Sequence, residues 1–262
     1  HHRFNKSGNR IIEKGIIVMK ILKFLVIALV GLQGINSFAD HHLESSPLAT
    51  GAMTILNLIA DDPAAYTEFQ KGNSDVFASM GAMLGGACVA VSGNDSPGEM
   101  QMFTFFPNLE GAFGMWDMMA TSPTIKDIQA DLRGRRELTG NQTLQIINGY
   151  EGEIYETWAT RTVEVNPTNP AAYLRAVSAL DTAYKQNGFS DIEFDVYQPI
   201  ASGNSATYTV IAVAPSLARL GAAFDALSAE LWAQDAYALV TASRSAPVSD
   251  KAYRCEQVYS AI

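Results

Sequence analysis

The sequence predicts an α+β protein made of two successive units, each with the element order strand–helix–strand–strand–helix–strand. The first observation is an internal repeat, in which residues 157–173 match residues 50–66 at an offset of 107. Six of the 17 aligned positions are identical, and both copies end in Pro-Ala-Ala-Tyr. The second is a Ser-Gly-Asn turn in each half, at 92–94 and 202–204. A repeat of this length indicates a duplicated supersecondary unit.

The first half opens with period-two alternation over residues 52–58, which predicts a strand. Asp61 and Asp62 then provide a helix cap, and Pro63 suits the first helical turn, where its missing N–H costs nothing. Gly81 ends this helix, and a turn rich in Gly, Asn, Asp and Pro separates two later strands. The predicted elements are strand 52–58, helix 63–80, strand 87–91, strand 100–106, a helix with Leu109, Ala112, Phe113, Trp116 and Met119 on one face, helix 124–133, and strand 143–147.

The second half gives the same order of elements. Asn169 and Pro170 open its first helix, and Pro215 precedes its second helix as Pro107 does in the first half, at an offset of 108. The alternating segment 191–197 has Ile192, Phe194 and Val196 on its apolar side. The predicted elements are strand 157–165, helix 170–187, strand 191–197, strand 206–214, a helix after Pro215, and strand 253–259.

The first 39 residues predict a leader and signal peptide. Residues 1–18 contain no Met, so we expect the natural start at Met19. Two lysines precede the apolar run 24–32, and residues 37–39 supply the small side chains for signal peptidase cleavage before Asp40. The run is too short to anchor the chain in a bilayer. We therefore expect a periplasmic or secreted protein, with no membrane association after cleavage.

Cleavage at this site leaves 223 residues, with 12 basic and 26 acidic side chains and a net charge of −14. Such a surface repels nucleic acid and anionic membranes, so neither is expected as a partner. The length suffices for two small units with a core, and we place them at residues 48–152 and 153–262. Either a monomer whose halves pair with each other or a homo-oligomer fits this arrangement.

This βαββαβ order is that of the ferredoxin-like fold. Two such units in one chain resemble the dimeric α+β barrel superfamily, which includes antibiotic-biosynthesis monooxygenase-like, NIPSNAP-like and stress-responsive barrel proteins. In that superfamily two units, usually from two chains, join their sheets into one barrel. The resemblance covers about residues 50–262 and rests on element order and the internal repeat. It implies a fused, pseudo-dimeric α+β barrel, and the function must be argued from the residues themselves.

The resemblance gives the two cysteines a role. Cys88 lies in the second predicted strand of the first half, and Cys255 lies in the last strand of the second half. These strands are the edges of a ferredoxin-like sheet, and a barrel joins such edges. A Cys88–Cys255 disulfide would then connect the two sheets, closing a loop worth roughly 4–5 kcal/mol in the chain-entropy model. The alternative is a pair of buried free thiols.

Histidine is absent from the predicted fold, since the four His residues lie at positions 1, 2, 41 and 42. Haem-binding members of the superfamily depend on a His in the domain, so the resemblance implies no haem function here. Catalysis by Ser-His-Asp or Cys-His sets and metal sites built on domain histidines are excluded for the same reason. No cofactor is expected.

The resemblance also implies a candidate catalytic site. Cofactor-independent monooxygenases of the superfamily use an Asn on the first strand with Trp, Tyr or Arg around a pocket between sheet and helices. Asn57 and Trp116 match this pattern by position, and Tyr66 and Arg133 would complete a polar end of the pocket.

Two features argue against this site. The second half has Glu164 and Phe224 at the positions of Asn57 and Trp116, so at most one half would be active. The alternation of strand 52–58 also allows Asn57 to face the barrel interior, away from the helices, and Trp116 lies on an apolar stripe that is typical of a core.

The favoured function is binding of a small apolar or amphipathic molecule, in a pocket with aromatic walls formed by Phe103, Phe105, Phe113 and Trp116. In the second half, the strand faces opposite the apolar stripes are polar. If they point into a closed barrel, poor solvation raises the carboxyl pKa values and creates a general base or a cation site. If they face water, they are solvated edge charges, which is the interpretation favoured here. These residues are Thr160, Thr162, Glu164, Glu193, Asp195 and Tyr197.

Three weaker metal and anion signals remain. All eight methionines after residue 39 fall in the first half. Thioethers bind Cu(I), but their spacing favours a role in core packing. After cleavage the chain would start Asp40-His41-His42, a weak candidate for an amino-terminal Cu(II) or Ni(II) site. The basic cluster at 133–136 either neutralises a helix C-terminus or holds an anionic substrate.

Overall fold

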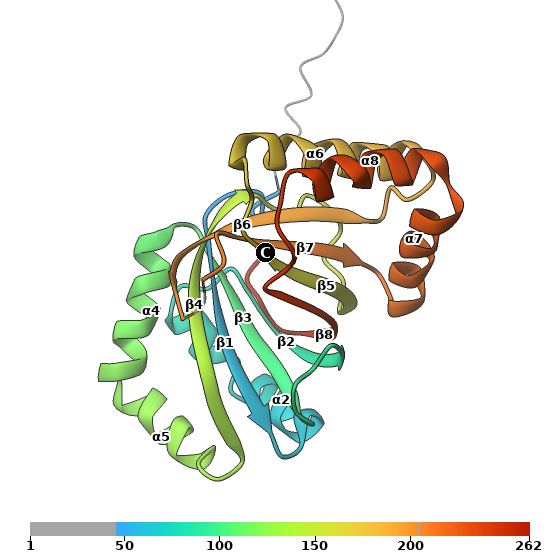
Figure 1. Cartoon of the computed structure of the whole chain (residues 1–262). Helices are drawn as coiled ribbons and strands as arrows, with labels where there is room; N and C mark the ends of the chain where they lie inside the picture. The colour runs from blue at the N-terminus through green and yellow to red at the C-terminus, as the bar shows by residue number, and fades with distance from the viewer. Residues whose placement is uncertain (1–45, 204) are drawn as a thin grey trace, which may run out of the picture. The chain divides into compact units, whose positions relative to one another are not determined.

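Eight antiparallel strands close into one barrel in the part of the chain that the structure, a computed structural model, describes: residues 46–203 and 205–262 (Figure 1). The order around the barrel is β1-β3-β2-β8-β5-β7-β6-β4. The strands are β1 (Ala52–Ala60), β2 (Leu84–Ser92), β3 (Glu99–Phe106), β4 (Arg136–Asn148), β5 (Thr157–Val165), β6 (Glu193–Ser202), β7 (Tyr208–Ala214) and β8 (Ser249–Ser260). The predicted signal peptide and the Asp40-His41-His42 segment lie outside the described residues.

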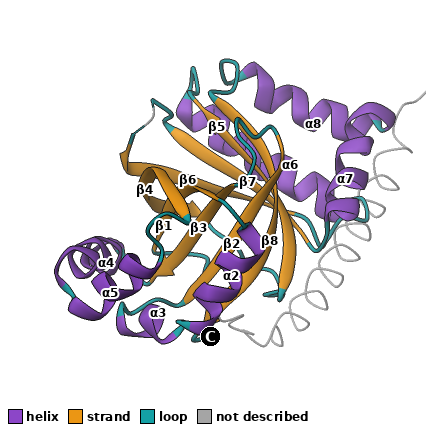
Figure 2. Ribbon diagram, turned by 90° about the horizontal axis from the view of Figure 1, so that it is seen from below, coloured by secondary structure: helices purple, strands orange, loops and turns teal. Residues whose placement is uncertain are grey.

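Seven helices lie outside the barrel in the described part of the chain, and Figure 2 shows them in two groups on different sides of the strands. The helices are α2 (Pro63–Gly72), α3 (Asp75–Ser79), α4 (Leu109–Thr121), α5 (Pro123–Asp131), α6 (Pro170–Gln186), α7 (Leu217–Ala229) and α8 (Leu231–Ala242). None of these described helices has the length and apolar character that crossing a membrane requires.

The barrel has two seams where strands of the first and second halves meet. Strands β4-β1-β3-β2 are consecutive around the barrel, and so are β8-β5-β7-β6. The seams are the antiparallel pairs β2–β8 and β4–β6. Cys88 pairs with Cys255 across the first seam, and the two form a disulfide. The predicted disulfide is confirmed, and the alternative of free thiols is wrong.

Alternation along the strands sorts side chains between the barrel interior and the helix-covered outer face. On β6, Phe194 and Val196 join the apolar cluster under the helices of the second half. Asp195 and Tyr197, which alternate with these residues along β6, line the barrel interior. Three apolar clusters result: one under the helices of each half and one inside the barrel.

The predicted helix starts are confirmed. Asp62 caps α2 by accepting hydrogen bonds from the N–H groups of Ala64 and Ala65, and Asn169 caps α6 by accepting one from Ala172. Proline follows each cap at the start of the helix. The favoured role of the methionines is supported too, because four buried ones pack in the cluster under the helices of the first half and in the cluster inside the barrel: Met53, Met100, Met102 and Met115.

Several predicted boundaries were wrong. The helix expected over 63–80 is two helices, because Asn73 stops α2 and its side-chain amide donates to the carbonyl of Phe69. Strand β4 starts at Arg136 instead of about residue 143, since its exposed first half carries polar residues without the apolar alternation that signals a strand. Helix α8 was not predicted.

A cavity inside the barrel as the candidate site

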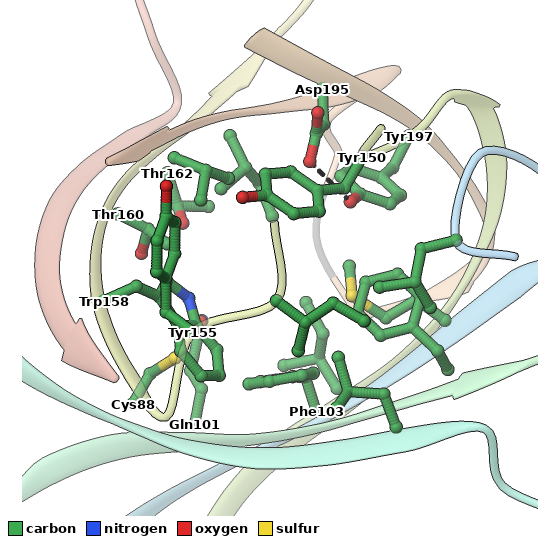
Figure 3. A pocket seen from close by; sticks show the side chains of 18 of the residues that line it. Cys88, Gln101, Phe103, Tyr150, Tyr155, Trp158, Thr160, Thr162, Asp195 and Tyr197 are labelled. Atoms are coloured by element: carbon green, nitrogen blue, oxygen red, sulfur yellow. Dashed lines mark hydrogen bonds between the residues drawn. The ribbon is translucent and has the colours of Figure 1, made fainter. Parts of the chain in front are cut away.

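The barrel interior contains a cavity with about 660 Å³ of empty space, counting the solvent at its mouth (Figure 3). Strands from both halves line it, together with the segment 149–156 that links β4 to β5. Its lining residues are Leu48, Met53, Ile55, Leu84, Cys88, Gln101, Phe103, Phe105, Tyr150, Glu153, Ile154, Tyr155, Trp158, Thr160, Thr162, Asp195, Tyr197, Ile211 and Val213.

The wall that the first half contributes is largely apolar. Phe103 and Phe105 project inward from β3, with their ring centroids 5.7 Å apart in an edge-to-face arrangement. Phe103 also meets the Trp158 ring edge-to-face at 5.6 Å. Met53 and Ile55 add aliphatic surface from β1. This wall can bury the apolar part of a small molecule, and the edge-to-face rings limit its shape.

The wall that the second half contributes carries most of the polar groups. Thr160 and Thr162 on β5 and Asp195 and Tyr197 on β6 all reach the cavity. Asp195 is only 2% exposed, and its Oδ2 accepts a hydrogen bond of 3.2 Å from the Tyr197 hydroxyl. Figure 3 shows this pair on the cavity wall, with the carboxyl group of Asp195 pointing inward.

Burial determines the protonation chemistry of this pair. Loss of solvent raises the pKa of Asp195 well above its usual value, and the nearby Glu193 carboxylate adds to the shift. The hydrogen bond from Tyr197 opposes it only in part. Burial and the adjacent carboxyl also raise the pKa of Tyr197. The cavity therefore contains a carboxyl group whose ionisation depends on what binds beside it.

The linking segment 149–156 contributes two tyrosines to the cavity. Its conformation is held at Tyr150, whose hydroxyl donates to the Glu153 carbonyl at 2.6 Å, and at Glu151, whose N–H donates to Glu193 Oε2 at 2.8 Å. Burial raises the pKa of Tyr150 and of Tyr155, so both are neutral hydroxyl donors at neutral pH. The connection between the halves is thus part of the cavity wall (Figure 3).

The structure does not bring the two predicted catalytic residues together. Asn57 accepts a hydrogen bond from Gln101 Nε2 at 2.9 Å, and Gln101 lines the barrel cavity. Trp116 lies on the outer side of the sheet, where its indole N–H donates to Thr143 Oγ1 at 2.8 Å. Asn57 shares the inward face of β1 with Met53 and Ile55, because alternate residues of a strand face the same way, whereas Trp116 reaches the outer face of the sheet from α4.

Trp116 and Tyr66 share a second cavity, which lies between the sheet and the helices of the first half. It has about 640 Å³ of empty space, counting open solvent. The arginine there is Arg136, whose guanidinium donates to the Tyr66 hydroxyl, and not the predicted Arg133, which is exposed. Phe113, also predicted as a ligand contact, is 44% exposed on α4 and lines none of the cavities described here.

The favoured interpretation of the polar faces as solvated edge charges is wrong. Thr160, Thr162, Glu193, Asp195 and Tyr197 are all buried, because the closed barrel removes the edges that would expose them. Glu164 is half-buried and accepts a hydrogen bond from Gln142 Nε2 at 3.0 Å, outside the cavity lining.

Sequence reasoning missed Tyr150, Tyr155 and Trp158 as cavity residues. The two tyrosines lie in a segment without regular structure, and no periodic pattern assigns such side chains to a face. The available signal was that the short stretch 150–158 contains three aromatic residues: Tyr150, Tyr155 and Trp158. In the described residues, no group of three or more His, Cys, Asp or Glu side chains could hold a metal ion.

Comparison with known proteins identifies the fold. No protein-family model matches the sequence, and no curated protein matches it significantly. Among solved structures, an anthrone oxidase-like protein superposes with a TM-score of 0.52 at 14% identity, covering 80% of this chain and 96% of its own. Proposed monooxygenases from Fusobacterium nucleatum and Lactobacillus acidophilus superpose with TM-scores of 0.52 and 0.51 at 11% and 12% identity. Both superpositions cover 80% of this chain, and they cover 94% of the first protein and 95% of the second.

These neighbours have the dimeric α+β barrel fold, and the eight-stranded barrel described above is of the same class. The predicted resemblance is therefore confirmed at the level of the fold. At such identities the likeness concerns architecture alone.

Proposed function

We propose that this protein binds a small, largely apolar molecule inside its barrel. The observation that carries the proposal is the cavity itself: a space inside the barrel whose exposed wall is mostly aromatic and aliphatic, with a group of polar side chains around Asp195 on one side. Small-molecule sites in proteins have this composition, in which apolar walls supply affinity and a few polar atoms set orientation.

The construction of the barrel supports this proposal. We infer that the chain is a tandem duplication in which each half stands for one subunit of a dimeric barrel, because β4-β1-β3-β2 and β8-β5-β7-β6 follow the same order. A fused barrel needs no partner chain to form its interior, and its two walls are free to differ. We also infer export, since the disulfide at the β2–β8 seam suits an oxidising compartment.

Calorimetric titration with 1-naphthylmethanol tests the proposal. We expect saturable binding with one site per chain. Val213→Phe adds a ring to the cavity wall and should weaken binding at least about tenfold. Val91→Phe adds the same ring at an exposed position of β2 and should leave binding unchanged. Absence of binding, or equal binding by both variants at similar melting temperatures, would contradict the proposal.

A second candidate function is cofactor-independent oxidation in the cavity between the sheet and the helices of the first half. It is favoured by the grouping of Tyr66, Trp116 and Arg136 there, and by structural similarity to an anthrone oxidase-like protein. The test is oxygen uptake in the presence of anthrone. We expect Trp116→Phe and Tyr66→Phe to slow it and Asn57→Ala, on the other face of the sheet, to leave it unchanged. No uptake above the uncatalysed rate would remove this candidate.

A further inference from the structure

We propose that the molecule held in the barrel cavity is an amine, whose protonated nitrogen pairs with the Asp195 carboxylate while its apolar part lies against the phenylalanine wall. This inference rests on the proposed binding function and names its ligand class. It follows from the charge balance of the cavity, from the surroundings of Asp195 and from the placement of aromatic rings.

The titratable groups that line the cavity are acidic or phenolic. They are Asp195, Glu153, Tyr150, Tyr155 and Tyr197, and no Lys, Arg or His from the described residues is among the lining side chains. A ligand with a carboxylate or phosphate would meet no cation there, and it would be repelled by the carboxyl groups. A cationic ligand supplies the charge that the wall lacks.

Asp195 forms no ion pair with any side chain of residues 46–203 and 205–262. Its charged neighbours are Glu193, two residues away on β6, and Asp181 and Lys185 from α6. Lys185 is already committed elsewhere, at 3.0 Å from Asp181 and 3.9 Å from Glu193. The contact that orients Asp195 is the hydroxyl of Tyr197, which bonds only one of its two carboxylate oxygens.

Burial without a counter-charge makes the ionised form of Asp195 costly. An ionised carboxylate removed from water is stabilised only by an opposite charge or several hydrogen bonds. This cost appears as the raised pKa of Asp195. A bound ammonium group pairs with the carboxylate and lowers that pKa again, so amine binding should release a proton wherever the free carboxyl is still protonated.

Two aromatic rings lie beside the Asp195 carboxyl group, where the ammonium group would be bound. Tyr197 comes from β6 and Tyr150 from the linking segment, and Figure 3 shows both next to Asp195. Cations are attracted to the faces of such rings, most strongly where water is excluded. The wall away from Asp195, where Phe103 packs edge-to-face on Trp158, is left for the hydrocarbon part of the ligand (Figure 3). The ligand class is therefore an amphipathic amine with an apolar or aromatic body.

The experiment compares two probes of matched shape, 1-naphthylmethylamine and 1-naphthylmethanol, by calorimetric titration of the full chain. We expect the amine to bind at least about tenfold more tightly than the alcohol at pH 8. The affinity of the amine should rise with pH across the range in which Asp195 of the free protein ionises, and the affinity of the alcohol should not. Heats measured in buffers of different ionisation enthalpy should show proton release for the amine only.

Asp195→Asn is the deciding variant, and Asp235→Asn is its control, because Asp235 is exposed on α8 and its replacement changes the net charge equally. Asp195→Asn should remove the preference for the amine while retaining binding of the alcohol, which also reports an intact cavity. Asp235→Asn should behave as the wild type. Amine and alcohol affinities that are equal in the wild type, or a preference that survives in Asp195→Asn, would overturn this inference but not the binding function. Failure of both probes would overturn the binding function itself.

Discussion

The two halves of the barrel share a strand order but give its cavity opposite chemistry. The third residue of β2 is Gly86, which pairs with Phe103. The third residue of β6 is Asp195, which pairs with Ile211. In the first half a large ring lies over a residue without a side chain, and in the second half a smaller side chain leaves room for a carboxyl group. Equal topology thus supports an apolar wall on one side and a polar wall on the other.

This difference shows that the features that maintain the barrel are separate from the side chains that decide which ligand its cavity can hold. Strand order depends on backbone pairing, on the edges that meet at the seams and on the turns between strands. The identity of an inward side chain matters only for filling and charge inside the cavity. When one chain forms the whole barrel, one wall can change without the other, which is impossible for two identical subunits.

The largest expected effect is at the seam that joins the two halves. Replacing both cysteines, Cys88→Ala with Cys255→Ala, opens a loop with a sequence separation of 167 and should cost about 4–5 kcal/mol of unfolding free energy. Urea unfolding of the oxidised wild type and the double variant measures this cost, and wild type in reductant is the control. A loss below about 1 kcal/mol would contradict this and show that the β2–β8 seam does not depend on its disulfide.

The next effect tests the apolar wall. A Cβ atom at Gly86 would overlap the Phe103 ring and lie 2.9 Å from the Glu256 carbonyl oxygen, so Gly86→Ala should destabilise the protein by about 1–3 kcal/mol. Gly114→Ala is the matched control: this glycine is in α4 with no atom near its missing Cβ, and the change should stabilise by up to about 1 kcal/mol. Similar effects from both variants would show that Phe103 moves freely and that the wall is not tightly packed.

A smaller loss of stability, equal in the two halves, is expected when the caps of the helices that follow β3 and β7 are removed. Asn108 caps α4 by accepting from the Gly111 N–H at 2.9 Å, and Ser216 caps α7 by accepting from the Arg219 N–H at 3.1 Å. Asn108→Ala and Ser216→Ala should each cost about 1 kcal/mol in thermal or urea unfolding. Unequal losses would mean that the halves differ in helix docking as well as in their cavity walls.

The smallest expected effect is the change of the unfolding free energy with pH that Asp195 causes. The unfolded chain releases the Asp195 proton near pH 3.9, while burial keeps the folded chain protonated to higher pH. The unfolding free energy should therefore fall as pH rises from about 4 and level off only above the folded-state pKa. Asp195→Asn should remove this part of the decline, as followed by urea unfolding between pH 4 and 8. A parallel decline in both proteins would assign it to other groups.

Much of the architecture was predictable from short sequence signals that occur in both halves of the chain. The Pro-Ala-Ala-Tyr copies, the caps at Asp62 and Asn169 and the alternation around Phe194 located strands and helices through local chemistry that any folded context preserves. Helix α8 and the exposed start of β4 escaped prediction, since neither shows a repeat or a regular alternation of apolar residues.

The site was only partly predictable. Alternation placed Asp195 and Tyr197 on one face, and Phe103 and Phe105 were expected to line a pocket, which they do inside the barrel. The pairing of Asn57 with Trp116 failed because position along a strand and a helix does not show which face of the sheet each side chain occupies. The arginine that reaches Tyr66 is Arg136 and not the predicted Arg133. Which of the two does so depends on the path of the chain between α5 and β4, where Arg133 and Arg136 form a β-bridge.

By itself, the sequence determined the α+β class, the repeated element order and the strands that carry the two cysteines, because these depend on local periodicity, capping and edge position. Only the tertiary structure decided that the polar faces of β5 and β6 are enclosed. Closure of the barrel brings β4 against β6 and β2 against β8, and it removes water from side chains that the sequence left equally suited to a solvated edge. That loss of water turns Asp195 from an ordinary surface charge into the polar centre of a cavity.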